Sequence, residues 1–342
     1  MQSKAASDLS SLSQGLASGP QDRAARAVRI DLKNFTDVHI SAANINNSLV
    51  FPGPRNPHAQ ELELFATFLK RAEENENDEF MIHYEGYSFR GHRERNATDG
   101  VWYRMRRQPQ VPPTIETLPT ALPVWLTDLL LSPTLKGGGL LYFTGSPAQG
   151  KTTTASATLV SRLATFGGYA QTIEDPPEMP LNGWHGKGFC SQTWVGLNKT
   201  DTWGEAIKGA LRSMPAGTPC MLYIGEVRDQ ECALTMLRAA SNGFLVIATG
   251  FANDILTGLQ SLAKLAGDNE STRQSLANAL RLICYMRITE GIIRPQCLVS
   301  TGNQSPIASK IRSGDFPQIQ NDINYQAQQT RLGKMITFED AS

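Results

Sequence analysis

The residues best suited to chemistry form a glycine turn that ends in Lys151 and Thr152. The turn fits the pattern G-x-x-x-x-G-K-[ST] at every fixed position. Such a loop cradles phosphates with backbone N–H groups, while its lysine reaches the β- and γ-phosphates and its hydroxyl ligates Mg²⁺. The sequence therefore predicts a site for a nucleotide and Mg²⁺. Its expected nucleotide contacts are Gly145, Ser146, Pro147, Ala148, Gln149, Gly150, Lys151, Thr152 and Thr153.

Acidic side chains follow two further apolar stretches of the chain. Glu174 and Glu178 come at and after the stretch 169–174, and Glu226 follows 220–225. In an open α/β sheet, ligands bind beyond the carboxyl ends of the strands. A glutamate that ends a strand is usually solvated, but its place after a phosphate loop favours a catalytic role. Glu226 is expected to ligate Mg²⁺ through water or to polarise the attacking water.

The elements that must position these residues alternate between strand and helix from 139 to about 300. This alternation predicts a mostly parallel sheet covered by helices. The predicted strands are 139–144, 169–174, 220–225 and 244–249, and the predicted helices are 151–166, 202–213, 229–241, 253–266 and 271–283. An antiparallel pair, 284–289 with 292–300, is predicted to turn at Glu290-Gly291, and the last forty residues are predicted to be helical.

The preceding half of the chain has a different pattern. Four predicted strands (35–40, 48–51, 79–90 and 101–107) and one helix (59–72) indicate a small α+β domain. Prolines then break both kinds of element and predict a linker. The expected organisation is a flexible tail (1–24), an N-terminal α+β domain (25–110), a proline-rich linker (111–124) and an α/β domain with C-terminal helices (125–342).

Composition excludes several classes of protein. The chain has 342 residues, and its 32 basic residues balance its 32 acidic ones, which argues against direct nucleic-acid binding. It lacks an apolar run of the roughly 18 residues that a membrane span needs. It also lacks an N-terminal apolar signal core, and none of its five cysteines forms C-x-x-C. A cytoplasmic chain without a zinc site or disulfide framework is predicted.

Two motifs resemble those of one family. Thr172-Ile173-Glu174-Asp175-Pro176 resembles the Asp box of the type II/type IV secretion and pilus ATPases, and Ile224-Gly225-Glu226-Val227-Arg228-Asp229 resembles their Walker B motif. The short N-terminal domain resembles that of the PilT-like branch, which includes pilus-retraction, conjugative and type IVB secretion ATPases. The resemblance implies a RecA-like P-loop ATPase domain behind a smaller PAS-like N-terminal domain.

By the same resemblance, the chain is a homohexameric ATP-driven motor. It would be peripheral to the inner membrane and work with platform or coupling proteins of a secretion, conjugation or pilus apparatus. Glu226 would be the catalytic carboxylate, assisted by Glu174 and Glu178, and Arg212 and Arg228 would bridge the γ-phosphate region to moving elements. An arginine of the N-terminal domain would also reach a nucleotide, with Arg90, Arg93, Arg104 and Arg106 as the candidates.

The chain departs from the family pattern at its His box. Phe244 and Phe251 stand where the two histidines are expected, although Thr249 remains and is expected to sense phosphate through a hydrogen bond. Pro147 removes one N–H donor from the phosphate loop, and Thr193 replaces an expected arginine. Two alternatives therefore stay open beside the motor: a slow or non-hydrolysing nucleotide-binding ring subunit, and a nucleic-acid motor on the same core.

Overall fold

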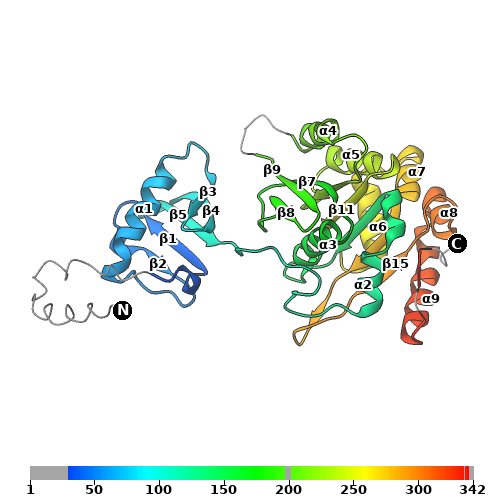
Figure 1. Ribbon diagram of the computed structural model, residues 1–342, viewed down its shortest axis with the longest axis horizontal. Helices are drawn as coiled ribbons and strands as arrows, with labels where there is room; N and C mark the ends of the chain where they lie inside the picture. Colours follow the sequence, from blue (N-terminus) through cyan, green and yellow to red (C-terminus); the bar gives the residue numbers. More distant parts are fainter. Residues whose placement is uncertain (1–29, 197–201, 335, 339–342) are drawn as a thin grey trace, which may run out of the picture. The chain divides into compact units, whose positions relative to one another are not determined.

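The computed structural model describes residues 30–196, 202–334 and 336–338, so the predicted tail (1–24) lies outside the described residues. The chain divides into two compact units (Figure 1). The first comprises residues up to Asp78 together with Gly91–Arg107, and the second comprises Glu79–Arg90 together with everything from Gln108 onward.

A five-stranded sheet with the order β2-β1-β5-β4-β3 dominates the chain before the linker. Val38 and Ile40 of β1 are fully buried and pair antiparallel with Met105 and Tyr103 of β5. The single α-helix described before the linker, α1, buries one face. This helix and the five-stranded sheet together confirm the predicted α+β fold. The bounds are β1 Asp37–Ser41, β2 Leu49–Val50, α1 Leu62–Glu73, β3 Glu79–Tyr84, β4 Tyr87–Asn96 and β5 Gly100–Arg107.

The single strand predicted over 79–90 is wrong. The structure has two strands there, β3 and β4, joined by a tight turn at Glu85 and Gly86. Both turn residues have positive φ, 47° and 77°, as a type I′ hairpin turn requires. The glycine in an otherwise strand-like run was the signal for this turn.

The second sheet has eight strands in the order β15-β12-β6-β11-β10-β7-β9-β8. The pairs from β12 to β9 are all parallel, and the two outermost pairs are antiparallel. This confirms the predicted α/β class. The strands are β6 Gly139–Thr144, β7 Gly168–Glu174, β8 Gly183–His185, β9 Gly188–Trp194, β10 Cys220–Ile224, β11 Leu245–Gly250, β12 Leu280–Tyr285 and β15 Gln296–Val299.

Helices cover both faces of this sheet (Figure 1). Alternate residues of a strand point to opposite faces, and in β6 Leu141 and Phe143 pack with α2 and α3, whereas Leu140 and Tyr142 pack with α4 to α9. The helices are α2 Val124–Leu130, α3 Lys151–Phe166, α4 Trp203–Ser213, α5 Gln230–Ser241, α6 Ile255–Leu265, α7 Glu270–Ala279, α8 Pro306–Ser313 and α9 Ile319–Arg331. Within the described ranges, none is long and apolar enough to cross a bilayer.

Two stretches of this sheet differ from the prediction. The predicted helix 271–283 ends at Ala279, because Leu280 begins β12, which pairs with β6 and is buried between β6 and β15. Sheet pairing here overrides the helical spacing of the apolar residues. Strands β8 and β9 were not predicted, although β9 pairs with β7 along its whole length. The predicted turn at Glu290-Gly291 is present, between β13 Ile288–Thr289 and β14 Ile292–Ile293.

Candidate functional site

The phosphate loop runs from the end of β6 to the start of α3. Its backbone enters the left-handed region at Ala148 (φ 60°) and Gly150 (φ 79°). Gly145 is required because a Cβ there would lie 2.6 Å from the carbonyl oxygen of Met286. The Gln149 side chain accepts a hydrogen bond of 2.6 Å from the N–H of Ile288 in β13, which anchors the loop to the β13–β14 hairpin.

A cavity of about 300 Å³ lies against this loop, at the carboxyl edge of the parallel strands. It joins the loop to the Asp box that follows β7, the Gly-Glu motif that follows β10 and the end of β11. It is lined by the sequence-predicted residues Pro147, Ala148, Gln149, Gly150, Lys151, Thr152, Thr153, Glu174, Glu178, Glu226 and Arg228, together with Asp175, Pro176, Trp203, Gly225, Thr249 and Phe251. The predicted contacts Gly145 and Ser146 are not among its lining residues, and their carbonyl oxygens bond Lys151 instead.

Lys151 is buried and turned back onto its own loop. Its Nζ donates to the carbonyl oxygens of Gly145 (2.9 Å) and Ser146 (2.8 Å). The same ammonium lies 4.2 Å from the ring centroid of Phe251, a cation–π contact. Burial lowers the pKa of Lys151, while the carboxylates of Glu226 and Glu178 oppose that change. In this arrangement the ammonium of Lys151 contacts only neutral groups, and a bound phosphate would replace them.

Three charged side chains form a chain across the cavity. Arg228 donates from Nε to Oε2 of Glu226 at 2.7 Å, and its Nη1 lies 3.7 Å from Oδ2 of Asp175. Trp194 donates from Nε1 to the other oxygen of Asp175 at 3.3 Å. The carboxylate of Glu226 is thereby held by a cation that also contacts the Asp box. Arg228 thus links the Walker B motif to the Asp box, while its expected role as a bridge from the γ-phosphate region to moving elements stays a prediction.

Glu174 is the most buried acid of the site, with 2% of its surface exposed. Burial raises its pKa to about 7, and a hydrogen bond from Gln192 partly counteracts this increase. Gln192 Nε2 donates to Glu174 Oε1 at 2.8 Å and to the Met179 carbonyl at 2.7 Å. Gly225 leaves room for this acid, because a Cβ there would lie 3.1 Å from Glu174 Cγ. Glu174 can therefore take up or release a proton near neutral pH.

The structure does not bring Arg212 into this cavity. It is exposed in the last turn of α4, whereas Trp203, at the first turn, is the α4 residue that lines the cavity. The two lie nine positions apart along the helix, a separation of about 13 Å. Within one chain, the expected contact of Arg212 with the γ-phosphate region is thus not made.

Three of the four candidate arginines in the N-terminal part have acidic partners nearby. Arg93 lies 3.7 Å from Asp78 and Arg106 lies 2.8 Å from Asp37, and Arg104 bonds Glu94. Arg90 is half-buried on β4. These pairings do not select one of the four for a role at a nucleotide.

Several residues of the site were not predicted from the sequence. The contact of Phe251 with Lys151 and the position of Trp203 at the cavity depend on long-range packing, and no local pattern signals them. The role of Gln192 follows from β9, an unpredicted strand that pairs with β7. Thr249, expected to sense phosphate, instead donates its hydroxyl to the carbonyl oxygen of Gly225, which ties the ends of β10 and β11 together.

The residues present fit a magnesium nucleotide. Thr152 and Glu226 border the same cavity as the loop N–H groups. Nowhere in 30–196, 202–334 and 336–338 do three or more His, Cys, Asp or Glu side chains group to hold a metal on their own. Mg²⁺ is typically bound through one or two protein oxygens plus substrate phosphates. The site therefore suits Mg²⁺ that arrives with its nucleotide.

Comparison with known proteins decides the family. Residues 125–330 match the model of the family described as "Type II/IV secretion system protein". The chain belongs to this family. Its curated relatives include a protein transport protein HofB homolog of Escherichia coli, 29% identical over 53% of this chain and 36% of the relative. They also include the type IV pilus ATPase PilU of Pseudomonas aeruginosa, 33% identical over 43% and 37%.

Solved structures confirm the fold over most of the chain. The pilus retraction motor PilT with bound ADP superposes with a TM-score of 0.66 at 24% identity, covering 90% of this chain and 92% of that one. The Legionella pneumophila ATPase DotB gives 0.63 at 16% identity, with 89% of each chain covered. These two superpositions confirm the predicted fold, an α/β domain with a smaller N-terminal domain.

The matches to the first curated relatives cover only 16% to 36% of the lengths of those relatives.

Proposed function

We propose that this chain hydrolyses ATP and uses the energy as a motor subunit of a secretion, conjugation or pilus machine. One observation carries the proposal: Lys151 of the phosphate loop and Glu226 of the Walker B motif line one cavity together. A nucleotide whose phosphates lie on the loop would present its γ-phosphate to the acids that follow β7 and β10. The family and the fold support this assignment.

Catalysis would depend on positioning and charge. The loop N–H groups and the N-terminus of α3 favour negative charge, and Lys151 would neutralise the terminal phosphates. Glu226, oriented by Arg228, would hold the attacking water in line with the γ-phosphorus. Mg²⁺, held by Thr152 and the phosphates, would supply charge neutralisation when bound. Glu174 would stabilise the hydrogen-bonded wall of the site through Gln192.

Lys151 must change partners before it can act. In the structure its three N–H groups face two carbonyl oxygens and the Phe251 ring. Charge-assisted bonds to phosphate are stronger than bonds to neutral carbonyls, so a triphosphate favours release of the lysine. Binding would then rotate Lys151 away from the ring and leave Phe251 over the open side of the cavity.

The test is phosphate release by the purified chain with Mg-ATP. Glu226→Gln keeps the size of the side chain and the hydrogen bond but removes the base, so release should fall about 100- to 1,000-fold while nucleotide binding persists. Exposed Glu270→Gln, at the start of α7, is the matched control and should leave release unchanged. Equal release from the wild-type chain and Glu226→Gln would refute the assignment of Glu226.

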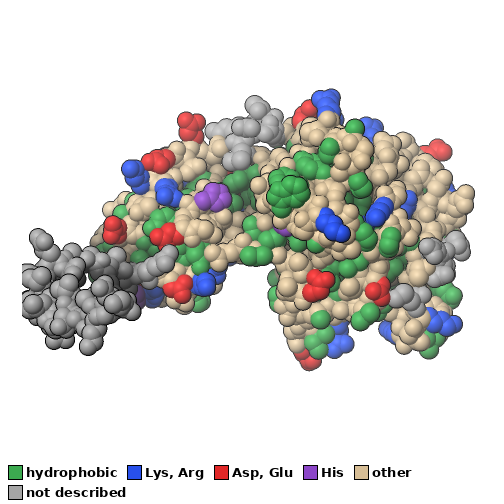
Figure 2. Space-filling view, viewed as in Figure 1, with side chains coloured by type: hydrophobic (Ala, Val, Ile, Leu, Met, Phe, Trp, Pro, Cys, Tyr) green, Lys and Arg blue, Asp and Glu red, His purple; other side chains and the backbone are tan. Residues whose placement is uncertain are grey.

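One observation favours a second candidate, a nucleotide-binding ring subunit with slow or absent turnover. Phe251 occupies the place of a family histidine and holds the catalytic lysine from the cavity side. Tight binding of ATP without phosphate release, in wild type as in Glu226→Gln, would support this candidate. A nucleic-acid motor is disfavoured, because Figure 2 shows basic and acidic side chains interspersed over the visible face rather than in a basic patch.

The assembly follows from the same reasoning. We propose a homohexamer that acts at the cytoplasmic face of the inner membrane, together with platform or coupling proteins. The part before residue 111 and the part after residue 124 would move as two domains across the proline-rich linker. An arginine of the first domain, and Arg212, would then serve the site of a neighbouring subunit. Sizing with and without a slowly hydrolysed ATP analogue tests this: a mass near six chains is expected, and a monomer in both conditions would contradict it.

A further inference from the structure

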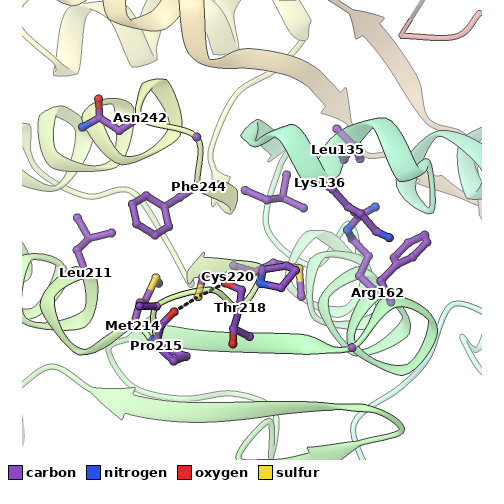
Figure 3. Close-up of a pocket in the computed structure, with 17 residues that line it drawn as sticks. Leu135, Lys136, Arg162, Leu211, Met214, Pro215, Thr218, Cys220, Asn242 and Phe244 are labelled. Carbon is purple, nitrogen blue, oxygen red and sulfur yellow. Dashed lines mark hydrogen bonds between the residues drawn. The ribbon is translucent and has the colours of Figure 1, made fainter.

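A second cavity, of about 370 Å³, lies at the opposite edge of the eight-stranded sheet, where the parallel strands begin. Figure 3 shows side chains that converge on it from the ends of α3, α4 and α5 and from the starts of β10 and β11. Its size falls in the range of small-molecule sites. Leu211, Met214 and Phe244 form an apolar surface on one side, and polar groups make up nearly half of the lining. None of the residues proposed for the nucleotide lines it.

Two cations meet in this cavity, and none of the described residues that line it is acidic. Lys136 Nζ and Arg162 Cζ lie 4.8 Å and 5.0 Å from the centroid of the same ring, Phe166. Arg162 is buried, with 2% of its surface exposed. Its Nη1 donates to the carbonyls of Leu130 and Ser132, but its Nε finds no hydrogen-bond partner among the described residues.

A buried guanidinium without an acidic partner is costly. Burial lowers the pKa of Arg162 to about 10, so the group still carries its charge at neutral pH. Arginine and lysine are the donors that bind carboxylates most strongly. The cavity thus presents uncompensated positive charge at one end and apolar surface at the other.

The helix ends at this edge act in the opposite direction, because the carboxyl end of a helix carries partial negative charge. The free carbonyls there are partly satisfied: the N–H of Gly167 caps α3, and that of Asn242 caps α5. A helix end is equivalent to about half an elementary charge before such capping. Two full side-chain charges at the cavity therefore outweigh these partial charges.

We propose that this cavity is a binding site for a small amphipathic carboxylate, with its acid group at Lys136 and Arg162 and its apolar body against Met214 and Phe244. The proposal is independent of nucleotide hydrolysis, since it involves none of the residues of the other cavity. A neutral molecule of the same shape would leave the cations unpaired, and a cationic one would be repelled by them.

The experiment uses three probes with one body: 4-phenylbutyrate, 4-phenylbutanol and 4-phenylbutylammonium. Isothermal titration calorimetry with the full chain should show the acid binding about tenfold more tightly than the alcohol, and no binding of the amine. Lys136→Gln, at an exposed position, should weaken binding of the acid about three- to tenfold and leave the alcohol unchanged. Ala216→Phe, which adds a ring at the cavity wall, should abolish binding of both.

Other results would overturn the proposal. Equal affinity for acid and alcohol would mean that the cations do not recognise the ligand. Loss of acid binding in Lys151→Met, with retention in Lys136→Gln and Ala216→Phe, would place the acid in the nucleotide cavity instead. An acid that fails to bind at millimolar concentration to the folded wild-type chain would refute the site outright. The test does not depend on Arg162→Met, a variant that would also lose the hydrogen bond from Arg162 to the end of α2.

Discussion

Charged side chains have different partners at the two edges of the eight-stranded sheet. At the carboxyl edge, Glu226 is paired with Arg228, and Lys151 bonds two carbonyls. At the amino edge, Lys136 and Arg162 contact the same aromatic ring, and within the described part of the chain no acid lines their cavity. Both cavities are of similar size, yet one contains a network of opposite charges and the other combines apolar side chains with two cations.

The polarity of the parallel strands explains this difference. Each strand-helix connection puts the amino end of a helix at the carboxyl edge and its carboxyl end at the opposite edge. Anions are stabilised near the first end and cations near the second. Lys151 opens α3 at the phosphate edge, whereas Arg162 and Phe166 close the same helix at the other. One helix therefore serves two cavities of different chemistry.

The largest effect is expected from a methyl group added at the amino edge. Gly138 has φ 85°, and a Cβ there would lie 2.3 Å from the carbonyl oxygen of Gly243. Gly138→Ala should cost about 2–4 kcal/mol in the free energy of unfolding, from strain and overpacking against backbone. Gly137→Ala is the control, since its Cβ would meet nothing within 4 Å. Urea unfolding measures both, and equal stability would show that this edge is loosely packed.

Glu174→Gln tests how far the buried, ionised carboxylate of Glu174 lowers the free energy of unfolding. The folded chain holds this proton up to about pH 7, whereas an ordinary glutamate releases it near pH 4.5. Wild-type stability should therefore rise as pH falls from about 7 towards 4.5, with the penalty fully present above pH 7. At pH 8 the glutamine variant should be more stable by about 3 kcal/mol.

That difference between Glu174→Gln and the wild type should vanish near pH 4.5. Chemical unfolding at pH 5, 6, 7 and 8 follows it. A constant difference across this range would show that Glu174 stays ionised in the folded chain, and hence that its hydrogen bond from Gln192 outweighs its burial.

Lys151→Met separates the two edges by ligand. Loss of the charge-assisted contact with phosphate should weaken ATP binding about 10- to 100-fold. Exposed Lys264→Met, on α6, should bind ATP as the wild type does. Titration with a fluorescent ATP analogue measures the affinities. Unchanged affinity in Lys151→Met would mean that the lysine stays on its loop carbonyls when nucleotide binds.

The smallest effect is expected at Phe251, which is 53% exposed. An exposed cation–π contact contributes about 0.5–1 kcal/mol, so Phe251→Leu should release Lys151 and raise ATP affinity about two- to fivefold. Phe251→Trp, with the stronger ring, should lower the affinity. Titration with the fluorescent ATP analogue measures the affinity of both variants. Weaker binding in the leucine variant would instead show that the ring contacts the nucleotide and stabilises it.

Much of this molecule could be predicted because its signals are local. The phosphate loop between β6 and α3, the Gly225-Glu226 ending of β10 and the alternation of strands and helices all depend on neighbours in sequence. They led correctly to the fold, the family and a cavity that contains both Lys151 and Glu226. What failed depends on residues far apart in the chain. Leu280 joins β12 only because β6 is beside it, and Gln192 reaches Glu174 only through the pairing of β9 with β7.

The expected role of Arg212 shows a different limit. A motif indicates which residue types a family retains, but it does not say whether a side chain acts within its own chain. Arg212 is exposed at the far end of α4, away from the nucleotide cavity of its own chain. The second cavity has no motif at all, because it is assembled from the ends of α3, α4 and α5 and two strand starts.

The bond between Gln149 and the N–H of Ile288 has a mechanical consequence. It fastens the phosphate loop to a short hairpin 139 positions further along the chain. A change in the loop must either carry the hairpin with it or break this bond. The tip of that hairpin, Glu290-Gly291, is exposed, so a movement of the loop that keeps this bond would also displace a segment at the protein surface.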